Sequence, residues 1–158
     1  MDCDPGLKHT DDAMRWAKRS AEFGDKEDFH VYRGLLEANW GQSREESCSL
    51  IDRTLTSELQ AAYSRRVSEQ LHPDTGNVLQ SFRFGTWQIL YVENQMSDPP
   101  FLFYSDDPLK SDVITTWSGA AAPFETQDIY EWVNKNAPGI PMNLAQCFAW
   151  RVTSDRDL

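Results

Sequence analysis

Cysteine is scarce in this chain, and long apolar runs are missing. The three cysteines, Cys3, Cys48 and Cys147, lie far apart and are odd in number. The sequence therefore predicts no disulfide framework and favours a reducing, cytoplasmic location. No run approaches the roughly 18 apolar residues of a membrane-spanning helix. The N-terminal stretch MDCDPGLKHTDD lacks the apolar centre of a secretory signal, so neither a membrane protein nor a secreted one is expected.

Motifs for catalysis and for cofactors are also missing. The three histidines form no HxH or HExxH pair, no CxxC occurs, and no G-x-S-x-G marks a nucleophile. The stretch WSGAAAPF at 117–124 lacks the G-K-[ST] end of a phosphate-binding loop. Regular alternation of strands and helices, which a Rossmann-type nucleotide site needs, is not seen. The sequence predicts no cofactor, no metal and no catalytic residue.

Basic residues are in the minority, and this imbalance bears on the partner. Lysine and arginine total 15 against 25 aspartates and glutamates, which gives a formal net charge of −10 and a pI near 4.6. Nucleic acids and anionic membranes are bound through basic side chains. The composition therefore disfavours both of these and favours a basic protein as partner.

What the chain does contain is enough apolar material for one folded domain. Hydrophobic residues make up 40% of the 158 positions and aromatic residues 12%, which argues against disorder. At this length a single domain over 1–158 is expected, with flexible ends at 1–9 and 154–158.

The N-terminal half carries helical patterns, about three in number. Thr10 caps the first, over 10–23, and Asp25 caps the second, which ends before Gly41. The sequence SREE at 43–46 is a capping box. Apolar residues follow it at helical spacing from Leu50 to Leu71. Thr54 and Thr56 in the middle leave open whether this is one helix or two.

Strand patterns follow Gly76. VLQSFRF, TWQILYVEN, PFLFYS and DVITTW are each bounded by turn residues. Both faces of 87–92 are apolar, which predicts a central strand covered on one side by the helices. A short helix is expected at 126–136 with Thr126 as its cap, and QCFAWRVT at 145–152 favours a last strand, although a helix is not excluded. The sequence thus predicts an α+β fold, in which the helices pack on an antiparallel sheet of four to five strands.

The most unusual stretch is the acidic segment at 93–131, which holds eight acidic residues and Lys110 as its one basic residue. Aromatic side chains border the carboxylates, and this combination is typical of protein-recognition surfaces. The expected partner-binding residues are Glu93, Asp98, Tyr104, Asp106, Asp107, Asp112, Trp117, Glu125, Asp128, Tyr130 and Glu131. For single residues of SDDP, turn formation is an equally good explanation.

Two classes of function use these carboxylates. In one, Asp106, Asp107 and Asp112 join Glu93 or Asp98 to hold a divalent cation or to act as an acid–base pair in a hydrolase. The spacing does not match an EF-hand loop. In the other, which we favour, the protein is a binding module. Small, acidic, single-domain chains without catalytic motifs are typical of bacterial immunity proteins that neutralise a cognate toxin. A chaperone or adaptor of a secreted effector is a further alternative.

Overall fold

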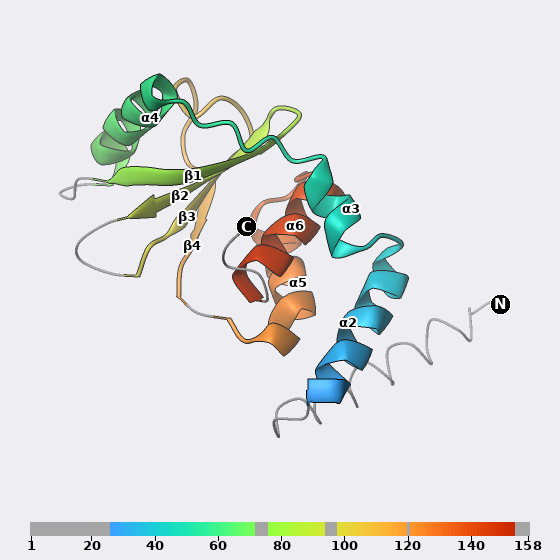
Figure 1. The fold of residues 1–158 in the computed structure, drawn as a ribbon. Helices are drawn as coiled ribbons and strands as arrows, with labels where there is room; N and C mark the ends of the chain where they lie inside the picture. The colour runs from blue at the N-terminus through green and yellow to red at the C-terminus, as the bar shows by residue number, and fades with distance from the viewer. Residues whose placement is uncertain (1–25, 72–75, 94–97, 120, 154–158) are drawn as a thin grey trace.

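The described part of the chain folds as five α-helices and one four-stranded antiparallel sheet (Figure 1), which confirms the α+β class. The structure is a computed structural model and describes residues 26–71, 76–93, 98–119 and 121–153. The expected helix at 10–23 and the expected flexible ends lie outside these residues. The helices are α2 (Lys26–Trp40), α3 (Arg44–Ser49), α4 (Ser57–Gln70), α5 (Thr126–Asn136) and α6 (Met142–Thr153). The strands are β1 (Asn77–Phe84), β2 (Trp87–Glu93), β3 (Phe101–Tyr104) and β4 (Thr115–Trp117).

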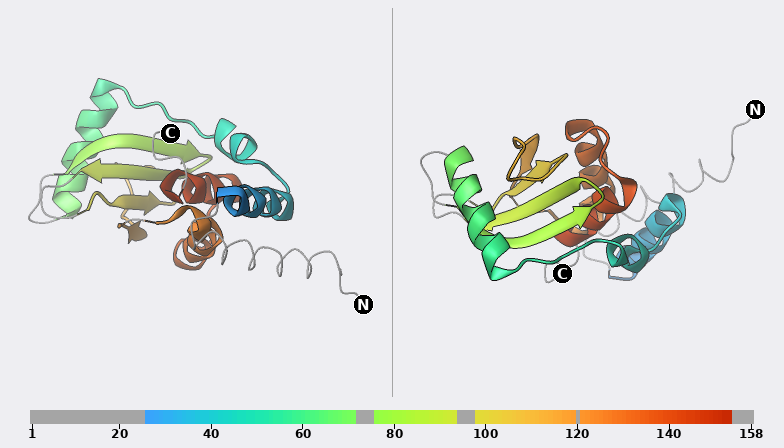
Figure 2. Two further views of the ribbon diagram at one scale, coloured as in Figure 1. Left: turned by 60° about the horizontal axis from the view of Figure 1, so that its bottom comes forward. Right: turned by 90° about the horizontal axis from the view of Figure 1, so that it is seen from above.

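The sheet lies between two layers of helices. Its strands follow the order β1-β2-β3-β4, so neighbours in the sequence are neighbours in the sheet. Helix α4 covers one face and α5 with α6 covers the other, while α3 packs on the outer side of α6 (Figures 1 and 2). The expected helical cover on one side of the central strand is present, and helices cover its other side as well. Since both faces of β2 are apolar, burying both of them is the favourable arrangement.

Alternation along β2 and β3 divides the core into two clusters. Ile89 and Phe103 point to the cluster that α2, α5 and α6 complete, whereas Leu90 and Leu102 point to the cluster under α4. All four side chains are fully buried. This is the period-two pattern that the sequence shows at 87–92.

A bulge in β1 changes which face its side chains meet. Val78 pairs with Val92 and Gln80 with Tyr91, so Leu79 has no partner in the ladder. Val78 and Phe82 are four residues apart and would share a face of a regular strand. Because of the extra residue, Val78 joins the cluster under α4 and Phe82 joins the opposite one.

The helical pattern from Leu50 to Leu71 is interrupted, so the option of two helices is the correct one. Helix α3 ends at Ser49, and the capping box predicted at its start is present: Ser43 Oγ accepts from Glu46 N, and Glu46 Oε1 accepts from Ser43 N. Helix α4 begins after Thr56, whose Oγ1 accepts from Leu59 N at 3.1 Å. Threonine is a good N-cap, which explains why the chain restarts here.

The segment between these helices and the first half of α4 together protect the outer edge of β1. Asp52 exchanges two backbone hydrogen bonds with Arg83, of 2.8 and 2.9 Å. Further along, Arg53 Nε donates to Ser81 O, and Gln60 Nε2 and Ser64 Oγ satisfy the carbonyl and the N–H of Val78. The edge groups of the strand are therefore paired by side chains and by one extended residue.

Helix α6 corrects the preference for a strand at 145–152. Ten of its twelve residues are buried, so the helix is covered on nearly every side. A run as short and as rich in apolar residues as QCFAWRVT does not distinguish a buried helix from a buried strand by its periodicity. No helix in the described part of the chain has both the length and the apolar character to cross a membrane.

A disulfide joins α3 to α6, which overturns the expectation of unpaired cysteines. Cys48 and Cys147 are 99 residues apart in sequence, and their Cα atoms are 4.9 Å apart. Their wide spacing in the sequence gives no sign of a shared location. Packing of α3 against α6 brings them together, and Cys147 is 2% exposed where the two helices meet.

Two buried tyrosines make folding sensitive to alkaline pH. Burial raises the pKa of Tyr32 and of Tyr104 from the ordinary value of 10.0 to about 12. Tyr32 Oη accepts from Gln127 N, and Tyr104 Oη donates to Gln70 Oε1 at 2.7 Å. Because the folded protein holds the neutral phenols, their contribution to stability is complete below pH 10 and is lost as the pH rises through 12.

We therefore expect the free energy of unfolding to fall between pH 10 and pH 12, as measured by urea unfolding at a series of pH values. The matched control is the double variant Tyr32→Phe/Tyr104→Phe, which has no phenol to ionise at these positions. A steep fall that is equal in both proteins would show that other groups are responsible.

Candidate functional site

The acidic turn at 105–112 is built by its own hydrogen bonds. Asp106 Oδ1 accepts from Asp107 N at 2.7 Å, and Asp107 Oδ1 accepts from Leu109 N at 3.0 Å. Ser111 Oγ also donates to Asp107 O. These bonds are the usual reason for aspartate and serine in tight turns. The turn explanation therefore accounts for Asp106 and Asp107.

Helix α4 holds the far end of this turn through Arg66. Its Nε donates to Pro108 O and its Nη2 to Ser111 O, both at 3.3 Å, and Nη2 lies 3.4 Å from Asp112 Oδ1. The Asp112 side chain is 95% exposed, so this ion pair is a weak surface contact. Within the described ranges no three His, Cys, Asp or Glu side chains lie close enough to hold a metal ion.

Tyr104, predicted as a surface anchor, lies in the core. It is 0% exposed, in the cluster under α4. The alternation of β3 puts its side chain on the same face as Leu102, which faces α4. This residue therefore offers no surface to a partner, and its phenol serves to bind Gln70.

The expected residues on α5 lie on the other side of the sheet from the acidic turn. Asp128 and Glu131 are exposed, and Tyr130 is half-buried with its ring 4.7 Å from that of Trp40. Glu125 precedes the helix, and its Oε2 accepts from Ala122 N at 2.8 Å. The cap predicted at Thr126 is instead a buried hydroxyl 2.8 Å from Thr153 Oγ1, while Glu125 occupies the cap position.

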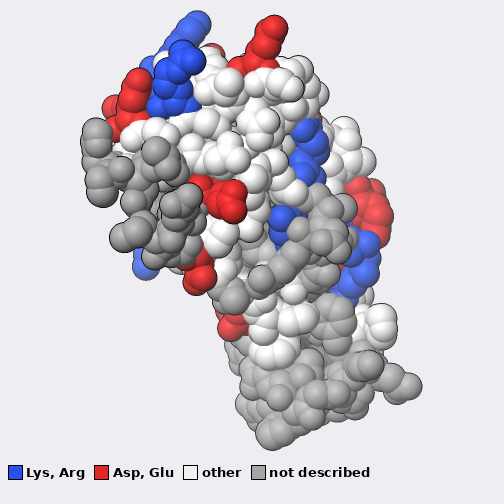
Figure 3. Space-filling model, turned by 60° about the vertical axis from the view of Figure 1, so that its left-hand side comes forward, with Lys and Arg blue, Asp and Glu red and all other residues white. Residues whose placement is uncertain are grey.

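The acidic segment is thus divided between different parts of the surface. In the face shown in Figure 3, acidic and basic side chains are scattered among uncharged ones and do not form one continuous acidic area. Glu93 is exposed at the end of β2. The structure does not bring all the predicted residues together.

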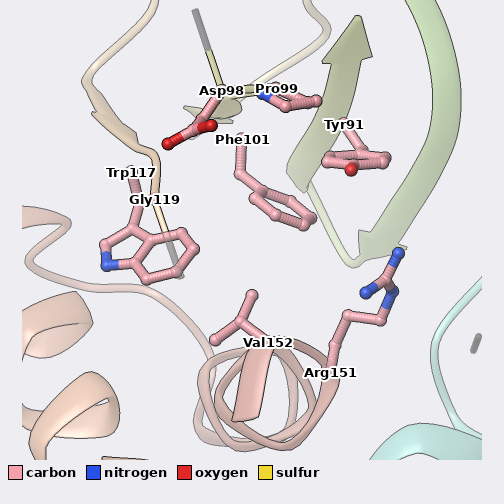
Figure 4. A pocket seen from close by; sticks show the side chains of 8 residues that line it. All are labelled: Tyr91, Asp98, Pro99, Phe101, Trp117, Gly119, Arg151 and Val152. Carbon is pink, nitrogen blue, oxygen red and sulfur yellow. The ribbon is translucent and has the colours of Figure 1, made fainter. Parts of the chain in front are cut away.

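Two of the predicted residues, Asp98 and Trp117, do meet, at a cavity of about 210 Å³ beside β2, β3 and β4. We call it the aromatic cavity. Its lining residues are Tyr91, Asp98, Pro99, Phe101, Trp117, Gly119, Arg151 and Val152. Figure 4 shows Trp117 and Asp98 at one end, Tyr91 and Arg151 at the other, and Phe101 between them.

Three rings from three neighbouring strands form the wall of the aromatic cavity. Phe101 stacks on Tyr91 with ring centroids 4.4 Å apart, and lies 6.1 Å from Trp117. Register places them together, because Phe101 pairs with Tyr91 on β2 and with Trp117 on β4. Phe148 of α6 packs edge-on against both Phe101 and Trp117, with ring centroids 5.0 and 5.8 Å apart.

Arg151 brings a buried positive charge to the aromatic cavity. The residue is 5% exposed, and its Nε and Nη2 donate to Gln80 Oε1 at 3.3 and 3.0 Å. Its guanidinium lies 5.4 Å from the ring of Tyr91 and 5.8 Å from that of Phe101, within the range of cation–π attraction. A charge in this setting acts more strongly than one in water.

Sequence reasoning missed Tyr91, Phe101 and Arg151 as site residues. The available signal was an arginine inside the apolar run QCFAWRVT, since arginine is seldom buried without a partner. Comparison of the chain with protein-family models, with curated proteins and with solved structures finds no match. What the site does must follow from its own residues.

Proposed function

We propose that this protein is a binding module that recognises a basic protein through the mouth of the aromatic cavity. The observation that carries the proposal is the meeting of an exposed carboxylate, Asp98, with a half-buried indole, Trp117, on one cavity. Tryptophan is enriched among the residues that dominate binding energy, particularly where it sits beside a pocket.

Charge supports a basic partner. The chain carries a formal net charge of −10, and such a field speeds the approach of a positively charged protein and weakens with salt. Small acidic chains of this kind include the immunity proteins of bacteria, so we propose a toxin as the partner. A toxin that acts on nucleic acid has the basic cleft that this surface would cover.

The location of the protein remains a prediction. The cytoplasmic assignment rests on the sequence, whereas the pair Cys48–Cys147 weighs against a permanently reducing compartment, where thiols stay reduced. We propose that the protein acts in the cytoplasm, where a reducing environment would hold this pair as thiols.

The test is binding, by isothermal titration, to the product of a toxin-type gene encoded next to the gene of this protein, once that neighbour has been identified. We expect Trp117→Ala to weaken the affinity by about 30-fold, which is the loss of one hot-spot residue. Asp98→Lys should weaken it as well and should flatten its dependence on salt.

The matched control is Asp106→Lys, which makes the same change of charge on the acidic turn. In a kinetic binding measurement by surface plasmon resonance, we expect it to slow association and to leave the dissociation rate unchanged. Full affinity in both cavity variants, with a loss in Asp106→Lys, would move the binding surface to the turn and contradict the proposal.

A further inference from the structure

We infer that the aromatic cavity accepts a tyrosine side chain, which the partner presents next to a lysine or arginine. This inference rests on the proposed function and names the group that enters the site. It depends on three properties of the cavity: its size, its buried donor and the charge at its mouth.

The size selects a single side chain. At about 210 Å³ the aromatic cavity is smaller than the roughly 300–1,000 Å³ of sites for drug-sized ligands and cofactors. Its walls are the rings of Tyr91, Phe101 and Trp117, and the side chain of Val152 lies below them (Figure 4). A flat ring makes the best contact with such walls, because aromatic pairs gain from stacked and edge-on arrangements.

The deep end selects a hydrogen-bond acceptor. Arg151 is 5% exposed and lies beside Tyr91 at the end away from Trp117 (Figure 4). A guanidinium group is positively charged, so it repels a lysine or arginine that enters to this depth. It also has five N–H donors and no acceptor, so its hydrogen-bond partner must be an acceptor. A phenol oxygen accepts a hydrogen bond and carries no charge, so it enters without the desolvation cost of a carboxylate. Phenylalanine fits the walls but offers no acceptor.

The mouth selects a basic neighbour. Asp98 is exposed and lies with Trp117 at the end opposite to Arg151 (Figure 4). A lysine or arginine beside the tyrosine can pair with this carboxylate while it stays in water. Such an exposed pair adds little affinity, but it fixes the direction in which the tyrosine enters.

Three peptides test this inference on the full 158-residue chain: acetyl-Lys-Tyr-Lys-amide, its Phe counterpart and its Ala counterpart. Binding is followed by nuclear magnetic resonance at the indole N–H of Trp117. We expect the Tyr peptide to bind about tenfold tighter than the Phe peptide, because a hydrogen bond to a charged donor is lost. The Ala peptide should leave the indole signal in place.

Variants locate the site. Trp117→Ala, in which binding is followed by isothermal titration because the indole probe is gone, should weaken binding of the Tyr peptide severely. Trp132→Ala should not weaken it, because Trp132 is half-buried on α5 and does not line the cavity. Asp98→Asn should reduce binding of the Tyr and Phe peptides equally. Equal affinity for the Tyr and Phe peptides would overturn the contact with Arg151, and an equal shift of Trp117 by the Ala peptide would overturn the cavity as the site.

These outcomes separate the inference from the proposed function. If the Tyr peptide binds but no basic toxin does, the proposed function is wrong and the proposal that the cavity accepts a tyrosine stands. Loss of toxin binding in Trp117→Ala, with Tyr and Ala peptides indistinguishable, would keep the function and overturn the inference.

Discussion

Removing the disulfide should lower the free energy of unfolding by about 4 kcal/mol, near the upper end of the 2–5 kcal/mol typical of native disulfides. The reason is the length of the loop that it closes, since Cys48 and Cys147 are 99 residues apart. A cross-link that closes a long loop removes much conformational entropy from the unfolded chain. The unfolded state is thereby raised in free energy relative to the folded state. The measurement is urea unfolding of the double variant Cys48→Ala/Cys147→Ala beside the oxidised wild-type protein.

Two controls accompany this experiment. Reducing agent should bring the wild-type protein down to the stability of the double variant and should leave the double variant unchanged. Cys3→Ala keeps the pair and should unfold as the wild type does. Identical stability of the oxidised and reduced wild-type protein would mean that the pair does not form in solution.

Replacing Phe148 with alanine should lower the free energy of unfolding by about 3–5 kcal/mol, as is typical of a fully buried phenylalanine. Phe148 is 1% exposed on α6. It makes edge-on contacts with Phe101, Phe103 and Trp117, at 5.0, 4.9 and 5.8 Å. Its removal leaves a cavity between α6 and the sheet that these rings cannot fill without moving. Thermal or urea unfolding measures the loss.

The matched control is Ile114→Ala, which truncates an apolar side chain that is 42% exposed and should cost less than about 1 kcal/mol. A loss below that value for Phe148→Ala would contradict the packing of α6 on the sheet. The same variant should also weaken binding at the aromatic cavity, because Phe101 and Trp117 lose their support.

Sequence patterns gave the local elements of this fold more reliably than its contacts. The capping box at Ser43, the span 126–136 and the strands after Gly76 are set by neighbouring residues, and each is found. Helix α6 and the bulge at Leu79 depend on which surfaces surround them, and the pattern of apolar residues does not predict those surfaces. The disulfide was missed for the same reason, because it follows from packing across 99 residues.

The candidate site shows the same limit. Asp98 and Trp117 were singled out as an acid and an aromatic residue within one charged segment, and the structure brings them to one cavity. The buried Arg151 comes from α6, far along the chain, and only the position of that helix puts it there. Tyr104 was misplaced because strand alternation gives two faces but does not say which of them, if either, meets water.

The covered edge of β1 has a consequence for association in solution. An open strand edge invites pairing with strands of other molecules, which leads to aggregation or to exchange of segments. Here Asp52 occupies the ladder positions opposite Arg83, and side chains from 53, 60 and 64 take up groups further along. A second molecule would have to displace these contacts before it could add a strand. The break between α3 and α4, together with the first turns of α4, thereby helps to keep this edge of the sheet from pairing with other molecules.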